Sequence, residues 1–196
     1  MAGPNIHIIG LGVSEFAELS TQTQTVLSGC DMVIGSSRQL DTVASLLDGI
    51  DIIKVVLPKL DRLKATIINA EAAAIAVIAS GDPLYFGIGR WFSNNFASQY
   101  LSFYPAVSSI QVACHRFGLS LQDISVLSLH GRPLEKLRSK IKANTTLVVL
   151  TDKFSQPQVL ARECIAAGFD QSILHVCENL GYTDEKLSSH SAQALA

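Results

Sequence analysis

Charge is scarce in this chain. Asp, Glu, Lys and Arg together make up only 16% of its 196 residues, and the formal net charge is −2. Proteins that bind nucleic acid usually carry a basic stripe, and none stands out here, so we expect no nucleic-acid partner. The 48% content of hydrophobic residues indicates instead a compact globular protein, long enough for one large domain or two small ones.

Long apolar runs are lacking too. The longest, such as Ala72–Ala79, are far shorter than the roughly 20 residues that cross a bilayer, so we expect no membrane segment. The stretch Met1–Asn5 has neither the basic nor the apolar region of a signal peptide. These features predict a cytoplasmic protein.

Cysteine is limited to four residues, and none of them are paired at the spacing of metal ligands, so we expect no metal site. We interpret all four as small, partly buried core residues in a reducing compartment. A catalytic thiol is the alternative. The four residues are Cys30, Cys114, Cys164 and Cys177.

Strand-like apolar runs alternate with segments of helical periodicity in the first part of the chain. This alternation is typical of right-handed βαβ units with a mostly parallel sheet. The predicted strands are Ile6–Gly12, Asp31–Gly35, Ile52–Val56, Ala73–Ala79 and Leu101–Tyr104. The predicted helices are Leu19–Ser28, Ser37–Leu47, Lys59–Ala70, Gly87–Phe96 and Ser108–Phe117.

The pattern pauses near Gly118–Asp123, and a second series follows. Its predicted strands are Ile124–Leu129, Thr145–Leu150 and Ile173–Cys177, and its predicted helices are Pro133–Ile141 and Pro157–Ala167. The chain closes on a helix-like fragment, Ala192–Ala196, with no strand after it. We therefore predict an α/β fold with two α/β domains and mostly parallel sheets, residues 1–118 and residues 119–196.

The most informative motif is Ser80-Gly81-Asp82-Pro83, which directly follows a buried strand. In an open α/β sheet, ligands bind at the carboxyl ends of the strands. Gly81 allows another molecule to approach the backbone closely, and Asp82-Pro83 fits an N-cap followed by the first helical position. Taken alone, the segment fits an ordinary helix start equally well.

Two more strand ends in the first half are rich in small or polar residues. Gly10-Leu11-Gly12 fits a ligand loop or a tight turn, but it is no dinucleotide fingerprint, because Glu15 occupies the third glycine position. Ser108 and Ser109 follow Tyr104-Pro105 and open a helix, either as N-caps or as groups that bind a polar ligand.

Polar side chains also follow strands in the second half. His130 and Arg132 come after Ile124–Leu129, and their chemistry suits a base and a carboxylate clamp. Lone histidines and arginines on loops are, however, more often structural than functional. Glu178 follows a later strand, where it pairs with Arg132 or caps the next element.

Taken together, Gly10–Gly12, Ser80–Pro83 with Gly87, and Pro105–Ser109 resemble the tetrapyrrole methylase family. Its members transfer a methyl group from S-adenosylmethionine to a corrin or sirohaem precursor. The resemblance runs from Ile6 to about Leu195. It is greatest to the branch that methylates C5 of precorrin-6Y or cobalt-precorrin-7, and the segments that carry this likeness are residues 107–111, 128–133 and 178–181.

The resemblance implies an S-adenosylmethionine-dependent C-methyltransferase of cobalamin biosynthesis, with the cofactor in a cleft between the two domains. The cofactor-binding positions that it implies are Gly12, Val13, Ser80, Gly81, Asp82, Tyr85, Ser108, Ser109, Thr151 and His190. A precorrin carries many carboxylates, which suits Arg132 as a substrate-binding residue, with Glu178 as a second. His130 is the candidate that takes up the proton released by the macrocycle. The resemblance also implies a homodimer and points to a decarboxylating C15-methyltransferase as a partner.

The chain departs from the family pattern at two places. The family's first loop usually continues Gly-Pro-Gly-Asp, whereas Gly12 is followed here by Val13, Ser14 and Glu15. The family usually has one more strand after the segment that matches Ala192–Ala196, so we expect the second domain to lack its final strand. Two alternatives remain open: a methylase of the same fold acting on sirohaem precursors, diphthamide or ribosomal RNA, and a non-catalytic ligand-binding relative.

Overall fold

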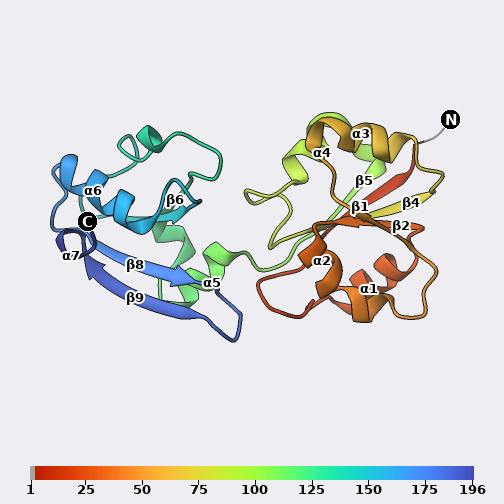
Figure 1. The fold of residues 1–196 in the computed structure, drawn as a ribbon, viewed down its shortest axis with the longest axis horizontal. Coiled ribbons are helices and arrows are strands. Elements are labelled where there is room, and N and C mark those ends of the chain that lie inside the picture. The colour runs from red at the N-terminus through yellow and green to blue at the C-terminus, as the bar shows by residue number, and fades with distance from the viewer. Residues whose placement is uncertain (1–2) are drawn as a thin grey trace. The chain divides into compact units, whose positions relative to one another are not determined.

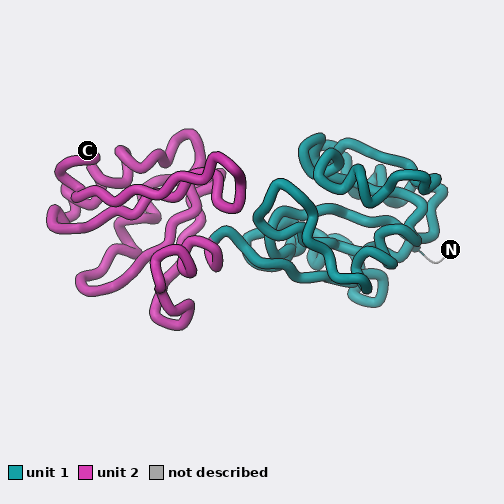
Figure 2. Tube along the Cα trace, turned by 90° about the horizontal axis from the view of Figure 1, so that it is seen from below, with its two compact units in different colours: residues 1–109 teal, residues 110–196 magenta. Residues whose placement is uncertain are grey.

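The computed structural model describes residues 3–196. The chain divides into two compact units, residues 1–109 and residues 110–196, which are coloured teal and magenta in Figure 2. The division falls at the start of helix α5 (Ser109–Arg116), upstream of the pause at Gly118–Asp123 in the sequence pattern.

The first unit is built on a five-stranded sheet with the strand order β3-β2-β4-β1-β5, and all of its pairs are parallel. The prediction of an α/β fold with a mostly parallel sheet is confirmed. The strands are β1 (Asn5–Gly10), β2 (Met32–Gly35), β3 (Ile53–Val56), β4 (Ala74–Ala79) and β5 (Leu101–Tyr104). The α-helices are α1 (Thr21–Ser28), α2 (Ser37–Thr42), α3 (Leu60–Ile68) and α4 (Gly89–Asn95), and the 3₁₀ turns are η1 (Ala44–Leu47) and η2 (Ser98–Tyr100).

Side chains of the central strands alternate between the two faces of this sheet. On β4, Ile75 and Val77 belong to one buried cluster, whereas Ala76 and Ile78 belong to another. Helices α3 and α4 cover the first face, and α1 and α2 cover the second (Figure 1). Since β4 is buried on both faces, its sequence is a continuous apolar run rather than an alternating one.

The second unit contains two small sheets. Strand β6 (Ile124–Ser128) pairs in parallel with β7 (Thr146–Leu150), and β8 (Ile173–Glu178) pairs antiparallel with β9 (Lys186–Ser191). Its other elements are α6 (Pro157–Ala166), α7 (Ala192–Leu195), η3 (Leu121–Asp123) and η4 (Leu134–Lys136). The centre of its core is formed by the buried side chains Leu127, Leu129, Leu137 and Leu160.

The predicted helix over Pro133–Ile141 is wrong. Only the single 3₁₀ turn η4 forms there, followed by further tight turns in which an amide bonds to a carbonyl three residues back, such as Lys140 N to Leu137 O at 2.8 Å. Leu137 is buried, and Ile141 packs against the same cluster. The turns therefore bury the apolar side chains whose spacing suggested a helix.

Strand β9 was not predicted, because Lys186–Ser191 contains a single apolar residue, Leu187. What forms the strand is its pairing with β8, in a register that runs from Glu178 opposite Lys186 to Ile173 opposite Ser191. A hairpin with antiparallel strands therefore completes the second unit.

Candidate functional site

The loops after β1 and β4 are joined backbone to backbone at the carboxyl edge of the first sheet. The Leu11 N–H donates to the Ala79 carbonyl at 2.9 Å, and the Gly81 N–H donates to the Gly12 carbonyl at 3.2 Å. The second bond belongs to an isolated antiparallel bridge between Gly12 and Gly81. Two segments far apart in the sequence therefore form one surface where ligands of open α/β sheets bind.

Glycine is required for this close approach. A Cβ at Gly10 would lie 2.2 Å from the Gly81 carbonyl oxygen, which no real side chain tolerates. Gly81 itself has φ +59°, and a Cβ there would lie 3.1 Å from the Cα of the buried Ser108. Gly12 has φ +79° and open space where its Cβ would be. The structure thus brings the predicted residues Gly12, Gly81 and Ser108 together.

The prediction that Asp82 caps a helix beginning at Pro83 is wrong. Helix α4 begins at Gly89 without a side-chain cap, and Asp82 Oδ1 instead accepts the Leu84 N–H at 2.8 Å in a local turn. A helix cannot run from Pro83 through Phe86, because Phe86 has φ 59°, in the left-handed region. Asp82 shapes the loop rather than starting a helix.

This loop exposes apolar side chains beside the joined backbone segments. Leu84, Tyr85 and Phe86 are 55%, 41% and 44% exposed, and Val107 from the loop after β5 is 48% exposed. Apolar groups next to backbone donors and acceptors suit a ligand that has both an apolar and a polar part.

Other predicted residues of the first unit lie in the same loops or directly after them. Val13 is half-buried next to Gly12, Ser80 is exposed directly after β4, and Ser109 is the first residue of α5. A residue that the sequence did not single out also reaches this edge: Gln39 of α2 donates from Nε2 to Ser80 Oγ at 3.1 Å. The only sequence signal for Gln39 is the Ser36-x-x-Gln39 spacing of a capping box.

In the second unit, Asp152 joins the loops after β6 and β7. Its Oδ2 accepts the Gly131 N–H at 3.0 Å, and its Oδ1 accepts the N–H groups of Phe154 and Ser155 and the Ser155 hydroxyl. The bond from Gly131, followed by those from Phe154 and Ser155, lowers the pKa of the Asp152 carboxyl to about 2. Asp152 was not predicted as a site residue.

These two loops carry three of the predicted residues. His130, Arg132 and Thr151 are all exposed, and they follow the carboxyl ends of the paired strands β6 and β7. Arg132 donates from Nη1 to the Ser128 carbonyl at 3.4 Å. Among residues 3–196, no ion pair joins Arg132 to Glu178, so the alternative in which the two side chains tie the loops together is wrong.

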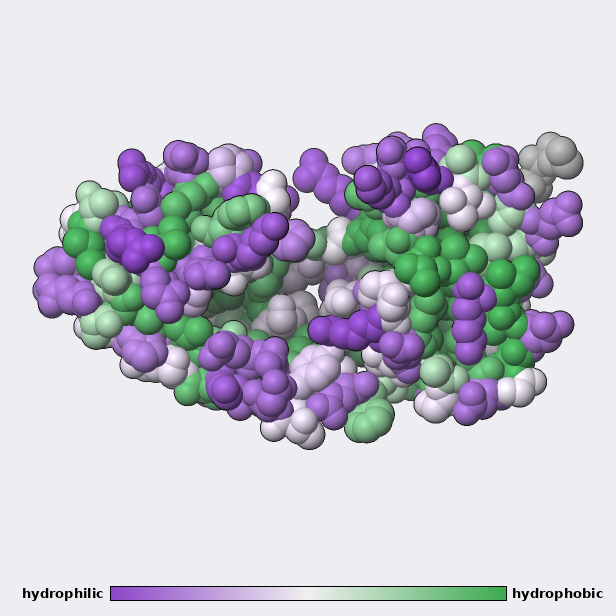
Figure 3. Space-filling view, viewed as in Figure 1, coloured by the Kyte–Doolittle hydropathy of each residue, from purple (hydrophilic) through white to green (hydrophobic). Residues whose placement is uncertain are grey.

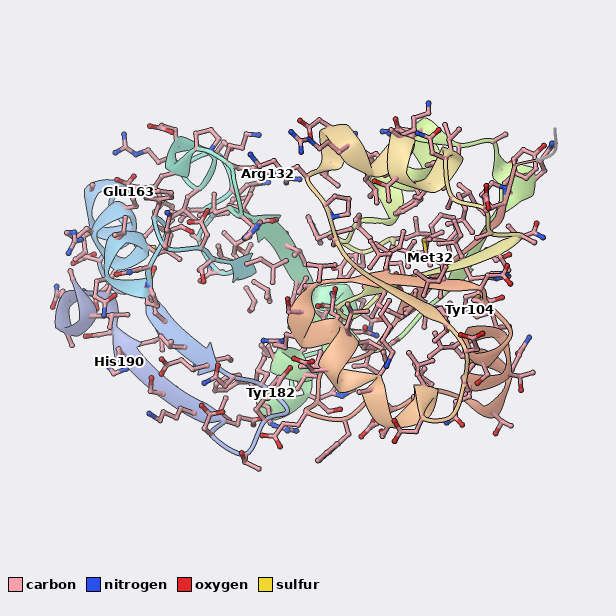
Figure 4. All side chains as sticks on the ribbon, turned by 45° about the vertical axis from the view of Figure 1, so that its right-hand side comes forward. Met32, Tyr104, Arg132, Glu163, Tyr182 and His190 are labelled. Carbon is pink, nitrogen blue, oxygen red and sulfur yellow. The ribbon has the colours of Figure 1, made fainter. Side chains whose placement is uncertain are left out.

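His190 and Glu178 lie at opposite ends of the β8–β9 hairpin. His190 lies within β9 opposite Leu174, and its Nε2 is 2.9 Å from Ser188 Oγ. Glu178 is exposed at the other end, opposite Lys186. Figure 4 shows Arg132 and His190 on separate parts of this unit. The structure does not bring His190 to the loops that hold Arg132.

A second carboxylate, Glu185, holds the turn of this hairpin. It accepts Nε and Nη2 of Arg116 on α5 at 2.6 and 3.1 Å, and its Oε2 accepts the Gly181 N–H at 2.7 Å. Chiefly because of Arg116, the pKa of the Glu185 carboxyl is lowered to about 2. Glu178–Gly181, one of the segments that carry the family resemblance, is thereby fixed to α5.

Three further features of residues 3–196 bear on the class of the protein. They contain no cluster of three or more His, Cys, Asp or Glu side chains able to hold a metal ion. None of the helices described there combines the length and the apolar character needed to cross a membrane. All four cysteines are free.

The fold and the first site define an α/β protein with a candidate ligand site at the carboxyl edge of a parallel sheet. Residues 5–196 match the family model of the Tetrapyrrole (Corrin/Porphyrin) Methylases. The chain belongs to this family.

Several curated relatives match nearly the whole chain. It is 33% identical over 192 residues to a precorrin-6Y C(5,15)-methyltransferase [decarboxylating] of Sinorhizobium sp., covering 98% of this chain and 46% of that protein. It is 27% identical over 199 residues to a probable cobalt-precorrin-7 C(5)-methyltransferase of Methanocaldococcus jannaschii, covering 97% of this chain and 91% of that protein. The chain spans about half the length of the decarboxylating relatives that it matches.

Solved structures confirm the fold. A precorrin-6Y methylase of Archaeoglobus fulgidus has a TM-score of 0.70 at 23% identity, covering 96% of this chain and 90% of that one. A uroporphyrin-III C-methyltransferase of Thermus thermophilus, complexed with S-adenosyl homocysteine, has a TM-score of 0.76 at 18% identity, covering 97% and 90%.

Proposed function

We propose that this protein is an S-adenosylmethionine-dependent methyltransferase that methylates C5 of precorrin-6Y or cobalt-precorrin-7 in cobalamin biosynthesis. The observation that carries the proposal is that relatives matching nearly the whole chain are named for methyl transfer at C5 of these macrocycles. The function inferred from the sequence is the same.

The loops of the first unit fit the cofactor of this family. Gly12 leaves open space, Ser80 offers an exposed hydroxyl, and Tyr85 offers an exposed apolar surface in the same loop as Gly81. We propose that the cofactor binds there, with contributions from Val13, Asp82, Ser108 and Ser109. When bound, S-adenosylmethionine supplies an electrophilic methyl group. Transfer of this group needs neither a metal nor a covalent enzyme intermediate. The residues of the chain therefore have to bind and align the reactants and exclude water from them.

We propose that the loops after β6 and β7 serve the macrocycle. Arg132 carries a guanidinium suited to a carboxylate and forms no ion pair within residues 3–196. His130, on the same loop, is the candidate for accepting the proton, and Thr151 is proposed to contact the cofactor. Glu178 and His190 lie at opposite ends of the hairpin. We propose Glu178 as a second substrate-binding residue and His190 as a further cofactor contact.

The assembly is proposed to be a cytoplasmic homodimer. Four free cysteines fit a reducing compartment. Apolar colour reaches the surface of the first unit in Figure 3. The exposed apolar side chains of this unit include Ile53 and Val56 of the edge strand β3. We also propose that a decarboxylating C15-methyltransferase acts with this protein, as the names of the longer relatives suggest.

The test has two stages. Calorimetric titration with S-adenosylmethionine and with its demethylated product should show binding to the purified protein. Incubation with S-adenosylmethionine and precorrin-6Y, cobalt-precorrin-7 or uroporphyrinogen III, followed by mass spectrometry, should show one added methyl group on one of the first two macrocycles. Methylation of uroporphyrinogen III instead would identify a sirohaem-type methylase, and an absence of cofactor binding would leave a non-catalytic relative.

A further inference from the structure

Both ends of the Gln39 side-chain amide are engaged where α2 meets β4. Gln39 Oε1 accepts the Ser36 N–H at 2.8 Å, and the Gln39 N–H donates in return to Ser36 Oγ at 3.3 Å, which completes a capping box. The Nε2 group of the same amide donates to Ser80 Oγ at 3.1 Å. One side chain therefore connects the start of α2 with the loop after β4.

The Ser36 N–H fixes which way this amide points. A backbone N–H can only donate, so the oxygen of the Gln39 amide has to face Ser36, and the nitrogen has to face Ser80. An amide nitrogen carries donors only. Ser80 Oγ must therefore accept from Gln39, and the hydroxyl proton of Ser80 points to a different partner.

The backbone on both sides of this contact is held in place. A Cβ at Gly35 would lie only 3.3 Å from the Cβ atoms of Gln39 and Ile78, so the glycine lets Gln39 come close to the sheet. Ser80 lies between Ala79 and Gly81, whose backbone groups are bonded to the loop after β1. Within residues 3–196, no acceptor for the Ser80 hydroxyl proton is found.

We propose that Gln39 is a positioning residue that makes Ser80 a hydrogen-bond donor toward the cofactor. This inference rests on the proposed function, because it takes the loop after β4 as the cofactor site. The cofactor offers acceptor oxygens on its ribose and on its carboxylate, and the Ser80 O–H donates to one of them. Gln39 does not itself touch the cofactor.

The Q39E variant separates this role from a structural one. A carboxylate at this position still accepts the Ser36 N–H, since Glu is the other residue of capping boxes, and a negative charge in the first helical turn is favourable. Because a carboxylate has no donor, it accepts a hydrogen bond from the Ser80 hydroxyl, whose proton then no longer points toward the cofactor. We expect an unchanged or higher melting temperature together with S-adenosylhomocysteine binding that is weaker by about two- to tenfold in calorimetry.

Two further variants make the result specific. Q39A removes the capping contact but does not accept the Ser80 proton. The affinity for S-adenosylhomocysteine should therefore fall in the order wild type, Q39A, Q39E. If Gln39 had a purely structural role, Q39A would bind most weakly. In an S80A background, Q39E should have little further effect. Q24E, on the exposed surface of α1, is the matched charge control and should bind as the wild type does.

The inference is overturned if Q39E binds S-adenosylhomocysteine as tightly as the wild type, or if Q39A binds more weakly than Q39E. It is also overturned if Q39E weakens binding equally with and without Ser80, because the effect is then one of charge. In all of these outcomes the wild-type protein still binds, and the proposed function stands. A wild-type protein that fails to bind removes both.

Discussion

The Gly131 amide nitrogen lies 3.0 Å from Asp152 Oδ2, and this bond joins the loop after β6 to the loop after β7. Gly131 has φ +63°, so the bond also holds a left-handed turn between His130 and Arg132. The directions of both side chains therefore depend on a carboxylate in a different loop.

The first prediction concerns acid stability. The folded-state pKa of Asp152, about 2, is below its ordinary value of 3.8. The bonds of the ionised carboxylate therefore stabilise the fold above about pH 4, and this contribution is lost as the pH falls through 2. D152N should lower stability in urea unfolding at pH 7, and the difference from wild type should shrink as the pH approaches 2. E135Q, which changes an exposed carboxylate of the same unit, should show no comparable loss. A difference that is independent of pH would contradict the assignment.

The second prediction tests the contact between the first two loops. G10A places a methyl group 2.2 Å from the Gly81 carbonyl oxygen. Because this oxygen belongs to backbone that is itself hydrogen-bonded, we expect a loss of about 1–3 kcal/mol or more in the free energy of unfolding. G3A, which meets nothing within 4 Å, is the control and should be neutral. Chemical denaturation measures both, and a neutral G10A would mean that the loops do not meet as described.

The third prediction compares two glycines in the left-handed region. Gly81 and Gly118 have φ +59° and +62°, so backbone strain from valine at either position should cost about 1–3 kcal/mol of stability, with a further cost at Gly81 from its Cβ 3.1 Å from the Ser108 Cα. Only G81V changes the proposed ligand surface. Calorimetry with S-adenosylhomocysteine should show binding that is lost in G81V and retained in G118V. If a folded G81V binds with unchanged affinity, the cofactor site is misplaced.

The fourth prediction concerns the guanidinium group of Arg132. R132K keeps the charge but loses the planar pair of donors. A charge-assisted pair contributes about 1.5–3 kcal/mol, so we expect the KM for the macrocycle to rise about tenfold or more. Binding of the methyl donor should change little. R138K is the matched control, because Arg138 forms a two-bond ion pair with Glu163 at 2.6 and 3.2 Å. It should leave the KM unchanged. Equal weakening of both ligands by R132K would remove Arg132 from the substrate site.

The sequence was sufficient to predict strands and helices wherever apolar periodicity and burial coincide. Ala74–Ala79 is buried along nearly its whole length, and the predicted strand differs from it by one residue. It was insufficient where pairing or local turns decide the structure. The strand Lys186–Ser191 is specified by its partner across the hairpin, and the delayed start of α4 depends on the positive φ of Phe86.

The candidate site shows the same contrast. Gly12, Gly81 and Ser108 were predicted from strand-end position and residue size, and they do lie together. Asp152 and Gln39 were missed, because each acts through a bond to a residue that is distant in the sequence, and no spacing along the chain records such a bond. Side chains that position others are therefore the part of a site that depends most on tertiary structure.

The bridge between the first two loops consists of main-chain atoms alone, the Gly12 carbonyl and the Gly81 amide. Every residue except proline offers the same two groups, so substitutions beyond Gly12 change the side chains at the candidate site while the backbone bridge is kept. Val13, Ser14 and Glu15, which replace the more usual Pro-Gly-Asp, are exchanges of this kind. The first loop can therefore be varied in a library, or by natural drift, to alter ligand preference while the scaffold beneath it is retained.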